Sequence, residues 1–232
     1  MADASSIVSM KGVQKRYRQG KVEVFALRGV DLEVQAGEFA AITGPSGSGK
    51  TTTLNMIGAL DSPSAGKVLL EGQELAALSR ADRSHLRRDR IGFVFQAYNL
   101  IPVLTAYENA EMVLALQNVP ERERKERVMA LLAEVGLEGL EERRPDELSG
   151  GQQQRVAIAR AIASNPAVTL ADEPTANVDS ETADKLLSIM EKLNEERGAT
   201  FIFSTHDPRV MERARRIIRM VDGRVESDET KG

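Results

Sequence analysis

A glycine-rich stretch in the first quarter of this 232-residue chain has the composition of a phosphate-binding loop. It comprises Gly44, Pro45, Ser46, Gly47, Ser48, Gly49, Lys50, Thr51 and Thr52. In such a loop, backbone N–H groups and the N-terminus of the following helix surround an anion. Lys50 is expected to reach the β- and γ-phosphates of a nucleotide, and the Thr51 hydroxyl to ligate Mg²⁺. The apolar strand EFAAIT before the loop and the helical stretch TTTLNMIGAL after it supply the context that this motif requires.

Two adjacent carboxylates, Asp172 and Glu173, follow the apolar stretch AVTLA. An aspartate at the C-terminal end of a central strand can complete a Mg²⁺ shell. Glu173 comes next and can act as a general base that polarises a water attacking the γ-phosphate. Simple turn chemistry before Pro174 is the alternative, but packing gives no reason to bring two acids to one edge of a strand. The pair therefore predicts nucleotide hydrolysis.

A second possible anion site lies at LSGGQ, which contains Ser149, Gly150, Gly151 and Gln152. Two adjacent glycines at the expected start of a helix of about fifteen residues have the layout of an anion-binding helix N-terminus. Since the chain already carries a phosphate loop, this segment raises the question of which phosphate it would bind.

The elements that must position these residues alternate between strand and helix, which predicts a mainly parallel sheet. Short strands are expected in the first forty residues, and a hairpin turn near Glu71 and Gly72. Further strands are expected at 38–43, 91–95, 168–171, 200–205, 216–221 and 223–227. Helices are expected at 105–118, 121–136 and 180–196 and after LSGGQ. The fold class is therefore α/β: a P-loop NTPase core, an N-terminal antiparallel β subdomain and an inserted α-helical subdomain.

We interpret the whole chain as one domain with an inserted helical part. Residues 1–95 and 160–232 are expected to form the core with the β subdomain, and residues 97–160 the helical subdomain that carries LSGGQ. The formal net charge of −4 argues against a nucleic-acid partner. The absence of cysteine excludes disulfides and thiolate metal sites. The sequence shows neither a signal peptide nor an apolar run of roughly 18 residues, so we expect a cytoplasmic protein with at most a peripheral membrane role.

The phosphate loop, LSGGQ and LADEP occur in an order that resembles the nucleotide-binding subunit of ATP-binding cassette (ABC) transporters, from about residue 7 to residue 227. This resemblance implies that the chain takes ATP and Mg²⁺. It further implies that the Ser149–Gly151 segment of a second copy closes over the γ-phosphate held by the first copy. The result is a head-to-tail, two-fold homodimer around two ATP molecules.

The same resemblance gives expected roles to four further residues. Tyr17 would stack on adenine, although an ordinary strand tyrosine is the alternative. Gln96 would reach the Mg²⁺ and the attacking water. Asp179 would lie in a loop that communicates between the subunits, with helix capping as the alternative. His206 would contact the γ-phosphate and act with Glu173, whereas His85 is expected merely on the surface.

Finer matches, in QAYNLIPVLTAYEN and LSGGQQQRVAIARA, resemble the ATPases of the lipoprotein-release and macrolide-export group. The implied partner is a separate integral-membrane permease on the cytoplasmic face of the inner membrane, reached through the segment from Tyr98 to Ala106. Ala176 stands where relatives commonly have glycine. A chromosome-maintenance or DNA-repair ATPase is disfavoured, because no heptads or cysteines separate Gln96 from Leu148. A regulatory ATPase of the cell-division type, which moves no substrate, remains an alternative.

Overall fold

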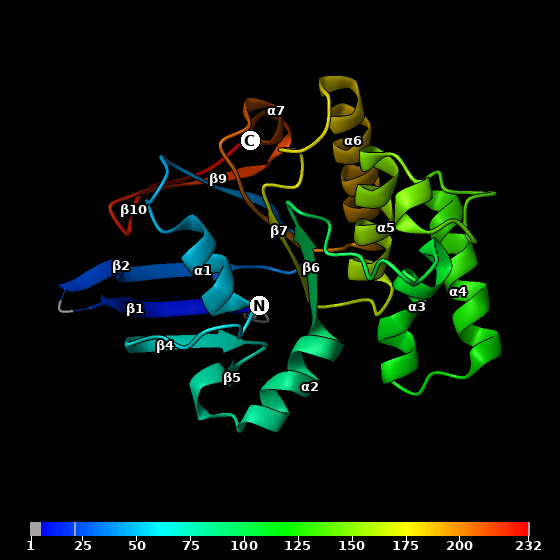
Figure 1. Cartoon of the computed structure of the whole chain (residues 1–232). Helices are drawn as coiled ribbons and strands as arrows, with labels where there is room; N and C mark the ends of the chain where they lie inside the picture. The colour runs from blue at the N-terminus through cyan, green and yellow to red at the C-terminus, as the bar shows by residue number, and fades with distance from the viewer. Residues whose placement is uncertain (1–5, 21, 232) are drawn as a thin grey trace, which may run out of the picture.

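The strands of the chain form two sheets, one antiparallel and one mainly parallel (Figure 1). The computed structural model describes residues 6–20 and 22–231. Residues 1–5, which belong to the N-terminal stretch in which the sequence shows no signal peptide, lie outside this range. The antiparallel sheet has the order β2-β1-β4-β5 and the parallel sheet the order β10-β9-β3-β8-β7-β6. The strands are β1 (Val8–Gln19), β2 (Val22–Val34), β3 (Phe39–Thr43), β4 (Ala65–Leu70), β5 (Gln73–Glu74), β6 (Ile91–Phe95), β7 (Val168–Asp172), β8 (Phe201–Ser204), β9 (Arg216–Val221) and β10 (Arg224–Thr230).

The expectation of short strands at the N-terminus is wrong, because β1 and β2 have 12 and 13 residues and pair along most of their length. Register shifts interrupt this pairing, and Gly12 and Gly29 take positive φ values near two of them. Charged residues such as Lys11 and Arg18 are exposed and lie within β1. The expected turn at Glu71 and Gly72 is present, with φ values of 49° and 78°.

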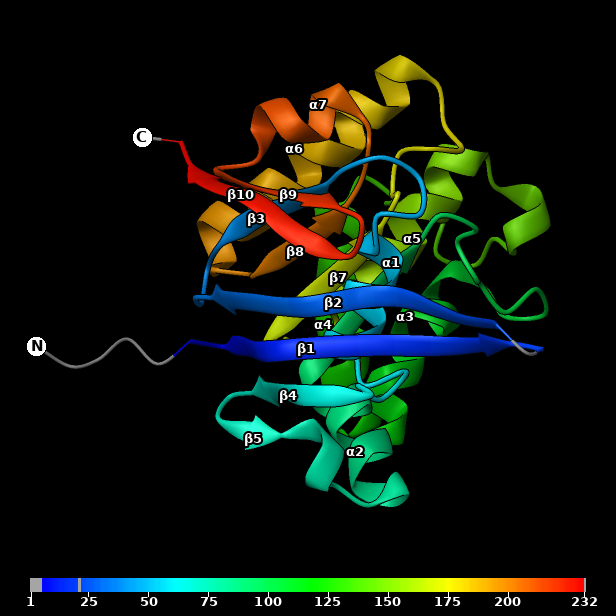
Figure 2. The same cartoon turned by 90° about the vertical axis from the view of Figure 1, so that its left-hand side faces the viewer.

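The parallel sheet is covered on both faces, which explains its nearly continuous apolar strands. Alternate residues of one strand enter different cores: Phe201 and Phe203 pack against helices on one face, and Ile202 packs on the other. The first core contains side chains from α5 (Gly150–Ile162), α6 (Ser180–Arg197) and α7 (Pro208–Arg213). The second contains α1 (Lys50–Ile57) and the antiparallel sheet. Figure 2 shows the antiparallel sheet toward the viewer, with α1 behind it and β10 beside it.

Three helices without intervening strands follow β6 and form the side of the molecule away from the antiparallel sheet (Figure 1). They are α3 (Ala106–Leu116), α4 (Glu121–Glu134) and α5, and they pack on one another. The helix α2 (Arg80–Arg90) leads into β6, and single 3₁₀ turns occur at Leu75–Ala77 and Pro145–Glu147. In the part of the chain that the structure describes, no helix is long and apolar enough to cross a membrane.

The parallel arrangement gathers the expected site residues at one edge. Strands β3, β6, β7 and β8 all run in the same direction, so their carboxyl ends meet there. The phosphate loop follows β3, Gln96 follows β6, and Glu173 follows β7. Thr205 and His206 follow β8. Residues far apart in sequence therefore arrive at one place because the strand order puts them there.

Candidate active site at the carboxyl edge of the parallel sheet

The phosphate loop requires glycine at two positions for steric reasons. Gly44 has φ 144°, and a Cβ there would lie 2.1 Å from the carbonyl oxygen of Met220. Gly49 has φ 103° and caps α1 without a side-chain hydrogen bond, which leaves N–H groups of the first helical turn free for an anion. The Lys50 ammonium donates to the carbonyls of Gly44 at 2.8 Å and Pro45 at 3.1 Å. The loop thus curls around its lysine, as a phosphate cradle must.

Two oxygen ligands suited to Mg²⁺ meet beside this loop. The Thr51 hydroxyl donates to a carboxylate oxygen of Asp172 at 3.2 Å, although the two residues are 121 positions apart in the sequence. The described residues contain no cluster of three or more His, Cys, Asp or Glu that could hold a metal. Such a sparse oxygen site fits Mg²⁺, which binds through one or two protein ligands and takes the rest from water and phosphate.

The second carboxylate, Glu173, is held in a defined position. Its backbone has φ 46°, an uncommon left-handed conformation, and its N–H donates to the carbonyl of Ser204 at 2.9 Å. One side-chain oxygen lies 2.7 Å from Nδ1 of His206, and the other accepts the Thr205 hydroxyl at 3.1 Å. The Glu173 side chain is 18% exposed and that of His206 is 76% exposed. A carboxylate that is screened, oriented and still open on one side can take a proton from a bound water.

Thr205 is a contact of Glu173 that the sequence interpretation missed, although it lies next to His206 in FSTHD. It is fully buried, and its hydroxyl also accepts the N–H of Asp207 at 2.9 Å. Arg209, which donates to Asp207, and a hydroxyl bond from Thr175 hold the pKa of Asp207 at about 2 despite its partial burial. The ionised Asp207 therefore fixes the turn that carries Thr205 at neutral pH.

We expect Thr205→Val to lower kcat for ATP by roughly tenfold with little change in KM, because a hydrogen bond to a charged group contributes about 1.5–3 kcal/mol. Thr205→Ser keeps the hydroxyl and should retain most of the rate. Steady-state hydrolysis measured for both variants checks this expectation. An equal loss of rate in the serine and valine variants would show that packing of the methyl group, rather than the hydroxyl, matters.

One cavity brings most of the expected nucleotide-binding residues together. Tyr17, Gln96, Glu173 and His206 line it with the phosphate loop, apart from the buried Ser48. Ala176 lines it too, as do three residues of β2 that the sequence interpretation did not single out: Val24, Phe25 and Ala26. Phe25 is 39% exposed, and the signal that the sequence offered was an aromatic residue in an expected strand. His85 is exposed, as expected, and does not line this cavity.

The LSGGQ segment lines no part of this cavity. Ser149 caps α5: its hydroxyl accepts the N–H of Gln152 at 3.3 Å, and the Gln152 side chain accepts the N–H of Ser149 at 2.8 Å. A Cβ on Gly150 would lie 2.8 Å from the Tyr98 hydroxyl, and one on Gly151 would lie 2.3 Å from a methyl carbon of Thr182. Both glycines therefore allow close packing within the chain, a role that the sequence interpretation did not foresee.

Asp179 caps α6, so capping, the alternative from the sequence, is confirmed. Its carboxylate accepts the backbone N–H of Thr182 at 2.9 Å and the Thr182 hydroxyl at 2.6 Å. These bonds, the hydroxyl first, lower the pKa of Asp179. The residue is exposed, and a contact with a second subunit stays a prediction.

Hydrogen bonds connect the segment after β6, residues 96–99, to Asn177 and to α5. The side-chain amide of Asn177 donates to the carbonyl of Gln96 at 2.9 Å, and the Tyr98 hydroxyl donates to the carbonyl of Asn177 at 3.1 Å. Arg160 of α5 donates to the carbonyls of Tyr98 at 2.9 Å and Asn99 at 2.6 Å. Burial lowers the pKa of Arg160. Nothing in the sequence pattern pointed to Asn177 or Arg160.

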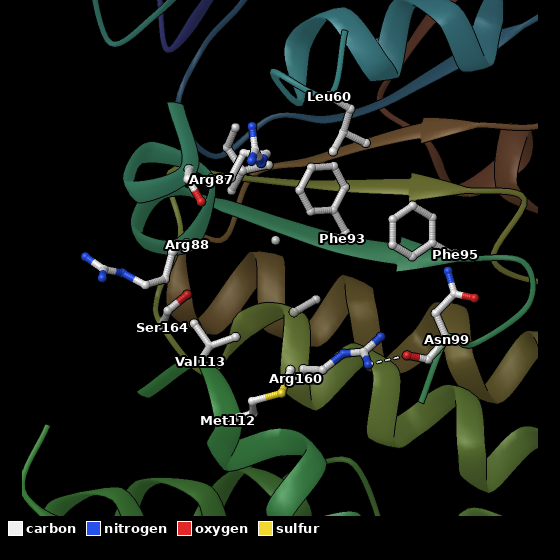
Figure 3. A pocket seen from close by; sticks show the side chains of 14 residues that line it. Leu60, Arg87, Arg88, Phe93, Phe95, Asn99, Met112, Val113, Arg160 and Ser164 are labelled. Carbon is white, nitrogen blue, oxygen red and sulfur yellow. Dashed lines mark hydrogen bonds between the residues drawn. The ribbon is translucent and has the colours of Figure 1, made fainter. Parts of the chain in front are cut away.

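A second hollow lies outside the nucleotide cavity, between β6 and the helices α2, α3 and α5 (Figure 3). Its apolar walls include Phe93, Phe95, Met112 and Val113. Three cations line it: Arg87, Arg88 and Arg160. Among the described residues that line it, none is acidic. In Figure 3, Arg160 reaches Asn99 at the end of this hollow near Phe95, so the hollow adjoins the segment that carries Gln96.

Comparisons with known proteins agree with this geometry. Residues 27–176 match the family described as ABC transporter. The lipoprotein-releasing system ATP-binding protein LolD of Anaeromyxobacter dehalogenans is 46% identical, covering 97% of this chain and 95% of that protein. The macrolide export ATP-binding/permease protein MacB of Syntrophobacter fumaroxidans is also 46% identical, over 96% of this chain but 31% of that longer protein.

Solved structures give the same result. The ATP-binding cassette MJ0796, whose sequence comes from Methanocaldococcus jannaschii, is 46% identical and has a TM-score of 0.88. The match covers 96% of this chain and 98% of that one. That structure is described as dimeric, in a post-hydrolysis state and bound to ADP and Pi.

Proposed function

This chain belongs to the ABC transporter family, and from that premise we propose that it is the motor of a transporter whose permease is of the lipoprotein-release or macrolide-export group. It binds ATP with Mg²⁺, hydrolyses ATP and works as a dimer beside a membrane permease. The observation that carries the function is the meeting of Thr51 with Asp172 and of Glu173 with His206 at the mouth of one phosphate loop. The choice of permease group rests on the relatives LolD and MacB.

The proposed division of labour follows from these contacts. Lys50 and the N-terminus of α1 bind the phosphates, and Thr51, Asp172 and Gln96 would hold Mg²⁺, which would neutralise phosphate charge. Glu173 takes the proton of the attacking water on its carboxylate. His206, 2.7 Å from Glu173, holds that carboxylate and reaches toward the γ-phosphate. Thr205 fixes the other carboxylate oxygen.

The position of the LSGGQ segment supports the proposal that each site is completed by a second copy. Ser149, Gly150, Gly151 and Gln152 lie outside the cavity of their own chain, yet they form a capped helix N-terminus with an exposed serine. A head-to-tail dimer brings that N-terminus to the partner's γ-phosphate, where negative charge develops in the reaction. The exposed Asp179, at the start of α6, is in our proposal part of the same interface.

We propose that the hollow of Figure 3 is the site where the permease binds. Arg88 pairs with Asp89, whereas Arg87 and Arg160 donate to backbone carbonyls. Apolar walls with these two cations fit a short amphipathic helix that carries a carboxylate. Gln96 follows the strand that forms one wall, so a movement of this occupant would reach the nucleotide site through the segment of Tyr98 and Asn99. In this proposal residues 97–160 work as a unit beside the core (1–95 and 160–232), on the cytoplasmic face of the inner membrane.

A substitution in this hollow tests the assignment. We expect Met112→Lys to reduce co-purification of the permease partner by about tenfold or more. The hollow already holds three arginines, and a bound permease helix would have to bury the added lysine charge beside them. ATP hydrolysis by the isolated chain should be retained. Met129→Lys is the matched control: Met129 lies on α4, is 37% exposed and does not line the hollow.

Reconstitution separates the transport function from a regulatory ATPase of the cell-division type. The chain and its permease in proteoliposomes should show ATP turnover that changes with the permease and moves a substrate. ATP turnover unaltered by the permease, with no substrate moved, would contradict the transport function.

A further inference from the structure

Three polar side chains meet at the end of the nucleotide cavity that is lined by Tyr17. The Tyr17 hydroxyl donates to Oδ2 of Asp61 at 3.0 Å, and the Lys15 ammonium donates to Oδ1 of Asp61 at 2.6 Å. Lys15 also donates to the carbonyl of Ser62 at 2.9 Å, and the N–H of Ser62 donates to Asp61 at 2.7 Å. Asp61 thus has a donor on each carboxylate oxygen, and none of the expected functions uses it.

The fold connects this cluster to the phosphate loop. Lys15 and Tyr17 both lie on β1, on either side of a register shift between Lys15 and Arg16, and both contact Asp61. Asp61 lies just after α1, where its N–H donates to the carbonyl of Asn55 in that helix. Since α1 starts at Lys50, one rigid helix joins the phosphate-binding end of the site to the anchor of the tyrosine.

The charge states at neutral pH suit this anchoring. Partial burial, and then the hydrogen bond to Asp61 and its charge, raise the pKa of Tyr17, so its phenol stays a donor. Although partial burial opposes it, hydrogen bonds from Lys15, Ser62 and Tyr17 lower the pKa of Asp61, which stays an ionised acceptor. The Lys15 side chain is 12% exposed, and its ammonium lies over the ring, 4.9 Å from the Tyr17 centroid. One face of the ring is therefore occupied by a cation, and a base can stack only on the other.

We propose that the Lys15–Asp61 pair is a positioning device that fixes the ring of Tyr17 for stacking on the nucleotide base. The inference rests on the proposed nucleotide site and on Tyr17 as its base-stacking residue. Fixing the ring beforehand removes the cost of ordering it when the nucleotide binds. The tyrosine hydroxyl is committed to Asp61 and is not available to the base, so Tyr17 contributes by stacking, which every base accepts.

Two consequences follow for affinity. The contribution of Tyr17 should be the same for ATP and GTP, and absent for inorganic triphosphate, which has no base. Tyr17→Ala should weaken ATP and GTP binding by about five- to 150-fold, the range measured for loss of one stacked base. Asp61→Ala and Tyr17→Phe keep an aromatic ring but free it, and each should weaken ATP binding by about two- to fivefold.

The experiment is calorimetric titration of the full chain and its variants with ATP, GTP and inorganic triphosphate. A double-mutant cycle isolates the positioning role: Asp61→Ala should have a smaller effect on ATP affinity in the Tyr17→Phe background than in the unmodified chain, because the hydroxyl tether is already broken and only the anchor of Lys15 is left to lose. Triphosphate affinity should stay unchanged in all three single variants. Lys15→Met, which removes the cation but keeps the hydroxyl bond, serves as a second route if Asp61→Ala folds poorly, and it should also weaken ATP but not triphosphate.

Each alternative outcome is distinct. If Asp61→Ala weakens triphosphate as much as ATP, or acts equally in the Tyr17→Phe background, Asp61 supports the loop generally and the inference fails. If Tyr17→Ala weakens ATP but Asp61→Ala, Tyr17→Phe and Lys15→Met do not, stacking stands and positioning fails. If Tyr17→Ala leaves ATP affinity unchanged while Lys50→Ala abolishes it, the stacking role fails, and the inference fails with it.

Discussion

Replacing Glu173 with glutamine is expected to slow ATP hydrolysis by about 10²- to 10⁴-fold, because the amide cannot take the proton of the attacking water. The substitution keeps the shape of the side chain and an oxygen that can accept the Thr205 hydroxyl. ATP binding should therefore persist, since the phosphate loop and Thr51 are untouched. With binding intact and hydrolysis blocked, the two-ATP dimer should accumulate.

Two measurements check this expectation: single-turnover hydrolysis, and size-exclusion chromatography in the presence of Mg²⁺-ATP. Glu181→Gln is the matched control, because Glu181 is an exposed glutamate that pairs with Lys185 outside the cavity. It should hydrolyse ATP like the unmodified chain and return to the monomer. A Glu173→Gln variant with near-normal turnover would remove Glu173 as the general base.

Replacing Ser149 with arginine is expected to abolish steady-state hydrolysis while ATP affinity of the isolated chain stays nearly unchanged. The exposed serine lies outside the cavity of its own chain, so the bulky cation should obstruct only the closure of the dimer. Ser149 also caps α5, and loss of that cap costs about 1 kcal/mol of stability. Ser149→Ala removes the same cap without adding bulk and is therefore the control. It should keep much more activity than the arginine variant.

Mixing variants shows directly whether the segment acts on its own chain or on its partner. In a head-to-tail dimer, a Lys50→Ala chain has an intact LSGGQ segment and a Ser149→Arg chain has an intact phosphate loop. Pairing them restores one complete site. An equimolar mixture of the two inactive proteins should recover about a quarter of normal activity, since random pairing makes half the dimers mixed and each mixed dimer has one complete site of two. A mixture that binds ATP and forms dimers but remains inactive would contradict composite sites.

Local chemistry made the phosphate loop and the carboxylates readable from sequence. Gly44 and Gly49 adopt backbone conformations that few other residues tolerate, and Lys50 and Thr51 follow them directly in the chain. The apolar stretch before Asp172 indicated a buried strand, and a parallel sheet brings the ends of such strands together. The roles of Tyr17, Gln96 and His206 came instead from the family resemblance. The cavity contains all three.

The lengths of β1 and β2 were misjudged because turn signals that contain glycine were taken to divide the first forty residues into short strands. Whether a strand continues depends on the partner that pairs with it, and β1 has two, β2 and β4. The pattern LSGGQ by itself indicated only that its glycines could bind an anion. Their close approach to Tyr98 and Thr182 depends on how α5 packs against distant segments.

The sequence by itself determined which chemistry this protein performs: phosphate binding, metal ligation and proton transfer need particular residue types at short spacing. Only the tertiary structure decided which side chains hold those groups in place. Thr205 on Glu173, Asp61 on Tyr17 and Arg160 on the carbonyl of Tyr98 are contacts between segments distant in sequence. Such pairs depend on strand order, register and helix packing, and no short pattern in the chain encodes them. The structure also placed the LSGGQ segment outside the cavity of its own chain, and the expectation of a composite site in the dimer now rests on that geometry.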